Sequence, residues 1–153
     1  MVMDDKTRLT QELDQSREHL RAALARLDAQ AEIYPGWTVK QLLAHICGWD
    51  EATTASLRAH AEGIEPAVPA ARGIDPYNAE SVETREALSY EQTVKEWELA
   101  REELETVIME MPPEKLEQPL VVPWGPTASV ARLIRVFVEH EEEHAEEIRR
   151  LFK

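Results

Sequence analysis

Two histidines near the end of the chain have the residue type and spacing that could bind a metal. His140 and His144 lie four positions apart in a stretch without proline, so on a helix their imidazoles stack on one face about one turn apart. They continue the apolar row of Leu133 and Phe137, which predicts that this face is buried. Two buried imidazoles are costly without partners, and a divalent metal suits a pair at this spacing.

A third imidazole is expected from another helix. His45 is the best candidate, because it shares the apolar side of its own predicted helix with Leu42 and Trp49. His45 lies roughly 10 Å from the start of its helix, and His144 roughly 12 Å from the end of the last helix. If these helices run antiparallel with flush ends, both residues lie at one level. Three neutral imidazoles would leave a coordination position open, as in catalytic sites, and they suit zinc, nickel, copper or iron.

The histidine pair has two other interpretations. One is a solvent-facing pair, because the surrounding stretch is rich in glutamate: Glu139, Glu141, Glu142, Glu143, Glu146 and Glu147. The other is the His-Glu-x-x-His motif of zinc peptidases. The peptidase motif needs a third ligand downstream, where only glutamates of the same helix are available. The inward phase of the pair and the matched height of His45 favour the three-histidine site over a solvated pair.

Several neighbours of these histidines are candidates for supporting roles. Asp50, Glu141 and Glu143 are carboxylates close in sequence to the proposed ligands, and carboxylates often orient the ring N–H of a ligating imidazole. Gly48 is the only glycine inside a predicted helix, where it costs about 1 kcal/mol relative to alanine. Its place three residues after His45 favours a role in keeping space open beside the metal.

Three tryptophans and one arginine near these positions could belong either to the core or surface of the fold or to the site. Trp49 is a pocket candidate, although a core position is its simplest interpretation. Trp37 and Trp124 flank helix starts. They are interpreted either as hydrophobic staples or as pocket walls. Arg101 interrupts an apolar stripe, and we favour a guanidinium that snorkels to solvent over one that meets an anionic substrate group.

The remaining histidines and the cysteine are expected outside the site. His19 and His60 lie at the margins of their helices, and both are expected to face solvent. Cys47 is two residues from His45 and is expected to be a small buried residue. It is the only cysteine among 153 residues, which excludes an internal disulfide framework and a multi-cysteine zinc site. A reducing cytoplasmic location is therefore expected.

Prolines divide the chain into the elements that must position these residues. Proline breaks helix interiors, so the four long proline-free intervals are predicted helices, and no window shows the alternation typical of strands. Capping-box patterns begin the second and third helices at Thr38 and Ser89. The predicted helices cover 4–33, 38–61, 89–111 and 127–153, with a crossover loop at 62–78 and a short helical stretch at 79–87. The fold expected is an all-α four-helix bundle with one long connection, in a single domain of residues 1–153.

Composition limits the classes of partner. Lys and Arg number 17 and Asp and Glu number 30, so the formal net charge is −13, which argues against binding to nucleic acid or to anionic lipid. A small-molecule substrate is compatible with this charge. The sequence begins without a signal-peptide pattern, and no apolar stretch approaches the roughly 20 residues of a membrane span.

Three segments together resemble a known family. Residues 35–46 (PGWTVKQLLAHI), the Thr-Ala-Ser-Val start at 127–130 and the His140/His144 pair are similar to the DinB-like (YfiT-like) superfamily of bacterial damage-inducible proteins. The resemblance implies an up-down-down-up bundle with a long crossover between helices 2 and 3. It also implies a nickel or zinc site at His45, His140 and His144, and often a homodimer. Characterised members include transferases and isomerases that use low-molecular-weight thiols such as bacillithiol or mycothiol.

One main hypothesis and three competing ones follow for the function. The main hypothesis is a small metal-dependent, thiol-dependent transferase-like enzyme of the stress response, in which the metal binds the thiol as a thiolate nucleophile. A hydrolase using a metal-bound water is a variant of the same site. Two different classes of protein also fit: a non-catalytic metal- or ligand-binding stress protein, and a structural dimer module whose histidines bind nothing.

Overall fold

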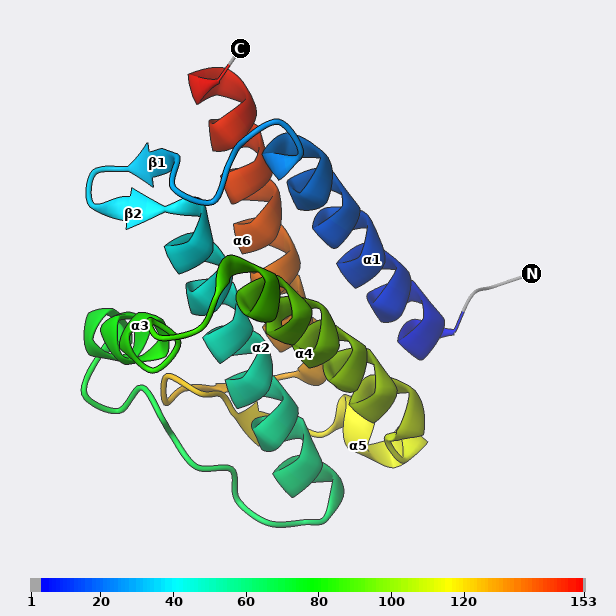
Figure 1. Cartoon of the computed structure of the whole chain (residues 1–153). Helices are drawn as coiled ribbons and strands as arrows, with labels where there is room; N and C mark the ends of the chain where they lie inside the picture. Colours follow the sequence, from blue (N-terminus) through cyan, green and yellow to red (C-terminus); the bar gives the residue numbers. More distant parts are fainter. Residues whose placement is uncertain (1–3, 153) are drawn as a thin grey trace.

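Four long helices form the core of the computed structural model, which describes residues 4–152 (Figure 1). They are α1 (Asp5–Leu24), α2 (Val39–Ala61), α4 (Tyr90–Glu110) and α6 (Val130–Leu151). α2 and α4 run in the same direction, and α1 and α6 run opposite to them. The closest packing is between α1 and α6 and between α2 and α4. The expected all-α, up-down-down-up four-helix bundle is confirmed.

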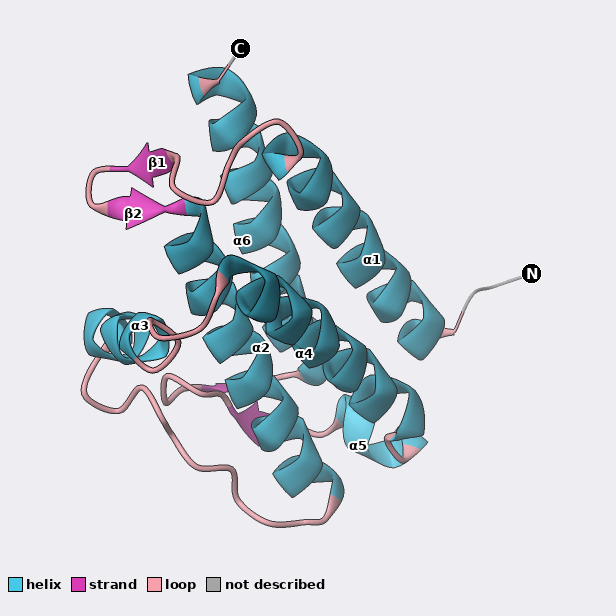
Figure 2. Cartoon of the chain, in the orientation of Figure 1, coloured by secondary structure: helices cyan, strands magenta, loops and turns pink. Residues whose placement is uncertain are grey.

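Short elements connect the long helices, and Figure 2 distinguishes them by colour. A small hairpin separates α1 from α2, and α3 lies against α2 within the long crossover. A second hairpin precedes α6. Their bounds are β1 (Glu32–Tyr34), β2 (Trp37–Thr38), α3 (Ile74–Glu83), α5 (Pro113–Glu117), β3 (Leu120–Val121) and β4 (Thr127–Ala128). Among the described residues, no helix combines the length and apolar character that a bilayer span requires.

Three predicted boundaries are wrong. The last helix begins at Val130 rather than at 127, because Thr127 and Ala128 pair with β3 as β4. The other two differ for separate reasons. The first helix ends at Leu24 rather than near residue 33, because the following segment folds into the β1–β2 hairpin around Gly36, whose φ is +82°. α3 begins at Ile74 rather than at 79, although Pro76 follows. Proline is tolerated in the first turn of a helix, where the backbone N–H has no intrahelical partner. Proline was therefore a misleading stop signal at this position.

The starts of α2 and α4 are confirmed. The Thr38 side chain accepts from the backbone N–H of Gln41, and the Gln41 side chain accepts from the backbone N–H of Thr38. Ser89 and Gln92 form the same reciprocal pair at α4. Each box satisfies two backbone donors that a helix start otherwise leaves unpaired. Both helices therefore begin at residues set by local sequence.

A buried network of four charges joins the four core helices. Arg17 of α1, Asp50 of α2, Arg101 of α4 and Glu141 of α6 are each at most 4% exposed. Arg17 contacts the carboxylates of Asp50 and Glu141 at 3.0 and 3.2 Å. Arg101 contacts the same two carboxylates at 3.2 and 3.1 Å. Two positive and two negative charges thus compensate one another where water is excluded.

The network corrects the expectation for Arg101 and places Glu141 in the protein interior. Arg101 neither snorkels nor faces a substrate, because both carboxylates of the network and the Leu13 carbonyl accept its N–H groups. Glu141 is buried, although its stretch of α6 is rich in glutamate. Burial alone would raise the pKa of Glu141, but the guanidinium groups of Arg101 and Arg17 outweigh burial and hold this pKa below its usual value. The carboxylate is therefore charged at neutral pH.

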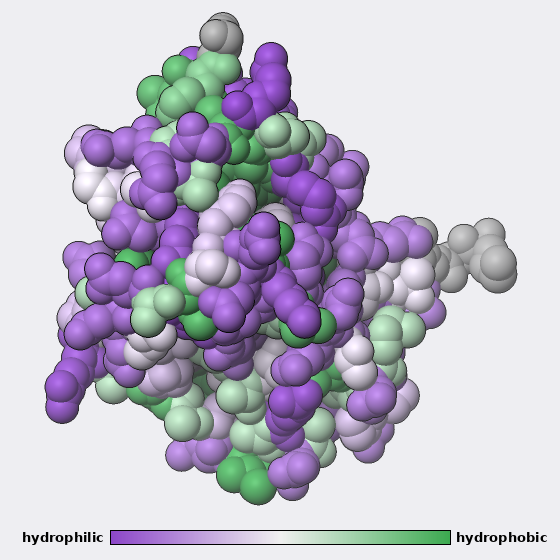
Figure 3. Space-filling model, viewed as in Figure 1, coloured by the Kyte–Doolittle hydropathy of each residue, from purple (hydrophilic) through white to green (hydrophobic). Residues whose placement is uncertain are grey.

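The visible surface is polar by contrast. Figure 3 shows a mostly hydrophilic face with scattered apolar residues. The large hydrophobic side chains that are exposed are spread over one loop and three helices: Ile64, Ile74, Leu99, Met109 and Leu151. Single exposed apolar residues are ordinary in a folded protein. The apolar residues that matter for structure lie between the four helices.

We predict that Glu141→Gln lowers the free energy of unfolding by about 3–5 kcal/mol, because it leaves Arg17 and Arg101 with one buried carboxylate instead of two. The neighbouring Glu142→Gln is the matched control, since Glu142 pairs with the half-exposed His19 and its loss should cost at most about 1 kcal/mol. Urea unfolding of both variants measures the difference. Equal losses would show that the network does not stabilise the bundle.

Candidate metal centre

Three histidines from two helices converge inside the bundle. His45 lies on α2, and His140 and His144 lie on α6. Their ring centroids are 5.3 Å apart for His45 and His140, 5.9 Å for His45 and His144, and 4.3 Å for the pair on α6. One ring nitrogen from each lies within 4.8 Å of the other two. The structure therefore brings together the three histidines that the sequence singled out.

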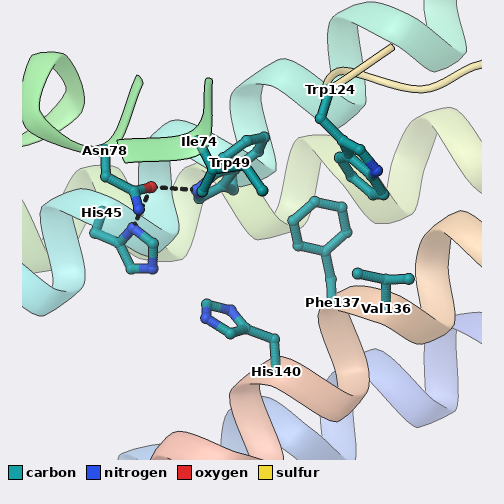
Figure 4. A pocket seen from close by; sticks show the side chains of 8 residues that line it. All are labelled: His45, Trp49, Ile74, Asn78, Trp124, Val136, Phe137 and His140. Atoms are coloured by element: carbon teal, nitrogen blue, oxygen red, sulfur yellow. Dashed lines mark hydrogen bonds between the residues drawn. The ribbon is translucent and has the colours of Figure 1, made fainter. Parts of the chain in front are cut away.

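Asn78 of α3 orients the ring of His45. Its Oδ1 lies 2.8 Å from His45 Nδ1 and 2.6 Å from Trp49 Nε1 (Figure 4). Indole Nε1 is always a donor, so the amide atom that it faces must be the oxygen. That oxygen accepts a hydrogen from His45 Nδ1 as well. The neutral imidazole then carries its lone pair on Nε2, the atom left free to bind a metal.

Tyr34 of the β1–β2 hairpin orients the ring of His144 in the same way. Its Oη lies 2.7 Å from His144 Nδ1. Burial first, and then the charge of Glu147 and a hydrogen bond to it, raise the pKa of the Tyr34 phenol. The phenol is therefore neutral in the physiological range, and its oxygen can accept the hydrogen of His144 Nδ1. This arrangement again leaves Nε2 as the atom with a lone pair.

The distances and the donor set fit a divalent metal. His144 Nε2 and His140 Nε2 are 3.0 Å apart, and two nitrogens bound tetrahedrally to one zinc at 2.0–2.1 Å would be about 3.3–3.4 Å apart, so a movement of a few tenths of an ångström would fit the ion. Burial, followed by the charge of His140, lowers the pKa of His45 to about 4 and that of His144 to about 3. The imidazoles therefore stay neutral in the physiological range and keep the lone pairs that a metal requires.

Two pockets meet at the histidines. The first, which we call the aromatic pocket, is lined by His45, Trp49, Ile74, Asn78, Trp124, Val136, Phe137 and His140. The second, the hairpin pocket, is lined by Tyr34, Pro35, Trp37, Leu42, His45, Asn78, His140, His144 and Glu147. The candidate pocket residue Trp49 thus lies beside the cluster, and Trp37 and Trp124 are pocket walls.

Several expected supporting residues lie elsewhere. Asp50 and Glu141 are engaged by the buried arginines, and the described residues show no hydrogen bond from either to an imidazole. The role expected for Gly48 is wrong, because a Cβ there would lie 2.2 Å from Ser81 Oγ of α3. Gly48 gives α3 its close approach to α2, rather than giving space to a metal. Asn78 and Tyr34 do what the carboxylates were expected to do.

Of the expectations for the other two histidines and the cysteine, two are confirmed and one is wrong. His19 faces solvent as expected, paired with Glu142. His60 is buried, with Nε2 2.8 Å from the Lys115 carbonyl oxygen, so its expected exposure is wrong. Cys47 is fully buried as expected. Burial is also the main cause that raises its thiol pKa to about 12, which makes it an unreactive thiol.

Comparison with known proteins gives a family and several structural relatives. A family model described as the mycothiol maleylpyruvate isomerase N-terminal domain matches residues 9–141. None of the curated proteins compared with the chain matches it. The relatives described below are each at most 16% identical, so their similarity concerns the fold.

Three solved structures share this fold. The mycothiol-dependent maleylpyruvate isomerase is 15% identical with a TM-score of 0.77, over 97% of this chain and 63% of its own. An uncharacterised protein from Clostridium difficile 630 is 16% identical, TM-score 0.79, over 99% and 97%. YfiT from Bacillus subtilis, described as a probable metal-dependent hydrolase with an unusual four-helix bundle topology, is 12% identical, TM-score 0.71, over 99% and 87%. The chain thus spans less than two thirds of the isomerase.

We predict that Asn78→Leu lowers zinc affinity about 10- to 100-fold, because the hydrogen on His45 Nδ1 loses its acceptor and the ring is no longer held. Asn78→Asp is the matched control, since its carboxylate still accepts from the imidazole and the indole, and it should stay near the original affinity. Competition with a chromophoric chelator measures both. Unchanged affinity in Asn78→Leu would contradict the orienting role of the amide.

The metal-free protein should lose stability as the pH falls below 6.5. The pKa of His45 is lowered from 6.5 to about 4 in the folded state, so between these values the unfolded chain binds the additional proton. This favours unfolding by up to about 1.4 kcal/mol per pH unit for this group. Urea unfolding with chelator present, at several values between pH 7 and pH 5, measures the slope. His45→Asn should make it shallower, since His140 and His144 still contribute, and identical slopes would contradict the prediction.

Proposed function

Because the chain belongs to the family of mycothiol maleylpyruvate isomerase N-terminal domains, within the DinB-like superfamily, we propose that it is a metal-dependent enzyme whose divalent ion is bound by His45, His140 and His144. The observation that carries this proposal is the convergence of three imidazole nitrogens within 4.8 Å. Nickel or zinc is the ion proposed, since both accept nitrogen ligands.

The chemistry proposed is activation of a nucleophile. A divalent ion at such a site lowers the pKa of a thiol or a water molecule and thereby supplies a thiolate or a hydroxide. Among the described residues, Glu147 is the only carboxylate that lines the hairpin pocket, and we propose that it takes the proton that the nucleophile loses. The indoles and the phenyl ring of the aromatic pocket limit the access of water from the other side.

A thiol-dependent, transferase-like reaction is the form we favour. Such a reaction needs room for two organic reactants, and the two pockets share His45, Asn78 and His140, so each reactant could reach the site from its own side. The isomerase relative is named for mycothiol, which supports a low-molecular-weight thiol as cofactor. A hydrolase on the same histidines is the second candidate, supported by the description of the YfiT structure.

The proposal also covers the substrate class, the partners, the oligomeric state and the biological role of the enzyme. The substrate is a small molecule, and the net charge of −13 opposes nucleic acid as a partner. We also propose that residues 1–153 form a single domain, that the protein is a homodimer and that it acts in a stress response. A stress protein that binds metal or ligand without turnover is the competing class, and its metal content would be the same.

We predict that His144→Ala abolishes stoichiometric zinc binding and leaves the helix content unchanged, because it removes one of the three ligands but no backbone hydrogen bond of α6. His19→Ala is the matched control, since His19 is a half-exposed histidine outside the cluster. Metal analysis of protein purified without a histidine tag measures zinc, and circular dichroism measures the helices. Stoichiometric zinc in His144→Ala would place the metal elsewhere.

Thiols should change the absorption of the cobalt-substituted protein. Titration with cysteine-based low-molecular-weight thiols should produce sulfur-to-cobalt charge-transfer bands in the original chain and none in His144→Ala. An absence of these bands with every thiol would contradict the thiol-dependent reaction. Hydrolysis of activated esters by the same sample would then support the hydrolase.

A further inference from the structure

The aromatic pocket has a composition of its own. Trp49, Trp124 and Phe137 form a triangle in which every pair of ring centroids is 6.2 Å apart. Ile74 and Val136 complete the apolar wall, and the pocket volume is about 210 Å³. Figure 4 shows the three rings on one side of this space and the imidazoles of His45 and His140 on the other. An occupant of this space would therefore touch both the rings and the imidazoles.

The described residues that line this pocket carry no formal charge. Their polar members are two neutral imidazoles and Asn78, and the amide oxygen is already shared between His45 and Trp49. An anion would find no Lys or Arg in this lining, and a cation no carboxylate. Either charged group would lose its hydration without a partner, which is costly in an apolar space.

The metal site sharpens the choice against a cation, whereas the choice against an anion rests on the uncharged lining of the metal-free pocket. Aromatic rings can attract a cation, but a divalent ion on three neutral imidazoles keeps its positive charge and would repel a cation in the adjoining pocket. A neutral apolar group meets neither obstacle. Size also agrees, because a dry cavity of about 150 Å³ is known to bind benzene, and this pocket is larger.

We propose that the aromatic pocket binds a neutral apolar group of the substrate, aromatic or branched aliphatic, and so places the substrate's reactive end beside His45 and His140. The catalytic part of this statement rests on the proposed function, whereas binding in the pocket does not. One amide oxygen of Asn78 holds both the Trp49 wall and the His45 ring. The wall that the occupant contacts is therefore held relative to the imidazole by two hydrogen bonds to one oxygen.

Three probes that each carry one benzene ring and differ in charge test the preference for a neutral group. Benzyl alcohol is neutral, benzoate is an anion and benzylammonium is a cation. In NMR titrations of the metal-free protein, benzyl alcohol should bind at least tenfold more tightly than either charged probe. Zinc should weaken benzylammonium further. Tighter binding of a charged probe, or no binding of benzyl alcohol, would overturn the proposal.

Filling the pocket tests its location. Val136→Trp should lower the affinity for benzyl alcohol at least tenfold while zinc binding persists. Leu151→Trp is the matched control, because Leu151 lies on the same helix and is 59% exposed, and it should change neither. If Val136→Trp does not fold, Val136→Leu with a smaller loss of affinity replaces it. Unchanged affinity in a folded Val136 variant would overturn the proposal.

The zinc and probe measurements separate this inference from the proposed function. Zinc binding without any preference for the neutral probe contradicts the pocket assignment alone. A clear preference for the neutral probe without zinc binding contradicts the metal-dependent enzyme, and leaves a pocket that binds an apolar ligand.

Discussion

Four compensated charges in the middle of the bundle are the interaction on which the rest of the structure depends. Arg17, Asp50, Arg101 and Glu141 come one from each core helix. Sliding any helix by one turn, about 5.4 Å, would leave buried charges without partners, and a broken buried pair costs several kcal/mol. The network therefore selects one set of helix heights. Because Glu141 directly follows His140, it also sets the height of the histidines on α6.

The candidate metal centre combines rigid helices with two short connecting elements. The helices supply the three imidazoles, whereas Asn78 comes from α3 and Tyr34 from the β1–β2 hairpin. These two partners decide which ring nitrogen of His45 and of His144 keeps its lone pair. The contact of Gly48 with Ser81 belongs to the same design, because it lets α3 approach α2 closely enough for Asn78 to reach His45. The connections are thus part of the site rather than links between helices.

The fold is shared with proteins that are described by different activities, an isomerase and a probable hydrolase. A common bundle can therefore host different reactions, and specificity is expected to come from the residues around the candidate metal centre. In this chain those residues are three aromatic rings on one side and Tyr34, Trp37 and Glu147 on the other. The uncharged aromatic side is the part of the site that we propose binds a neutral apolar group of the substrate.

The sequence alone determined the features that depend on local pattern and helical periodicity. These include the four helices, both capping boxes, and the three histidines, whose inward phase and matched heights follow from 3.6 residues per turn. The tertiary structure decided what depends on contacts between distant segments. The partners of Arg101 and Glu141, and the roles of Asn78 and Tyr34, belong to this class. Local patterns carry no record of which helix faces which, so hydrogen bonds across 33 to 125 positions of chain emerge only when the helices pack.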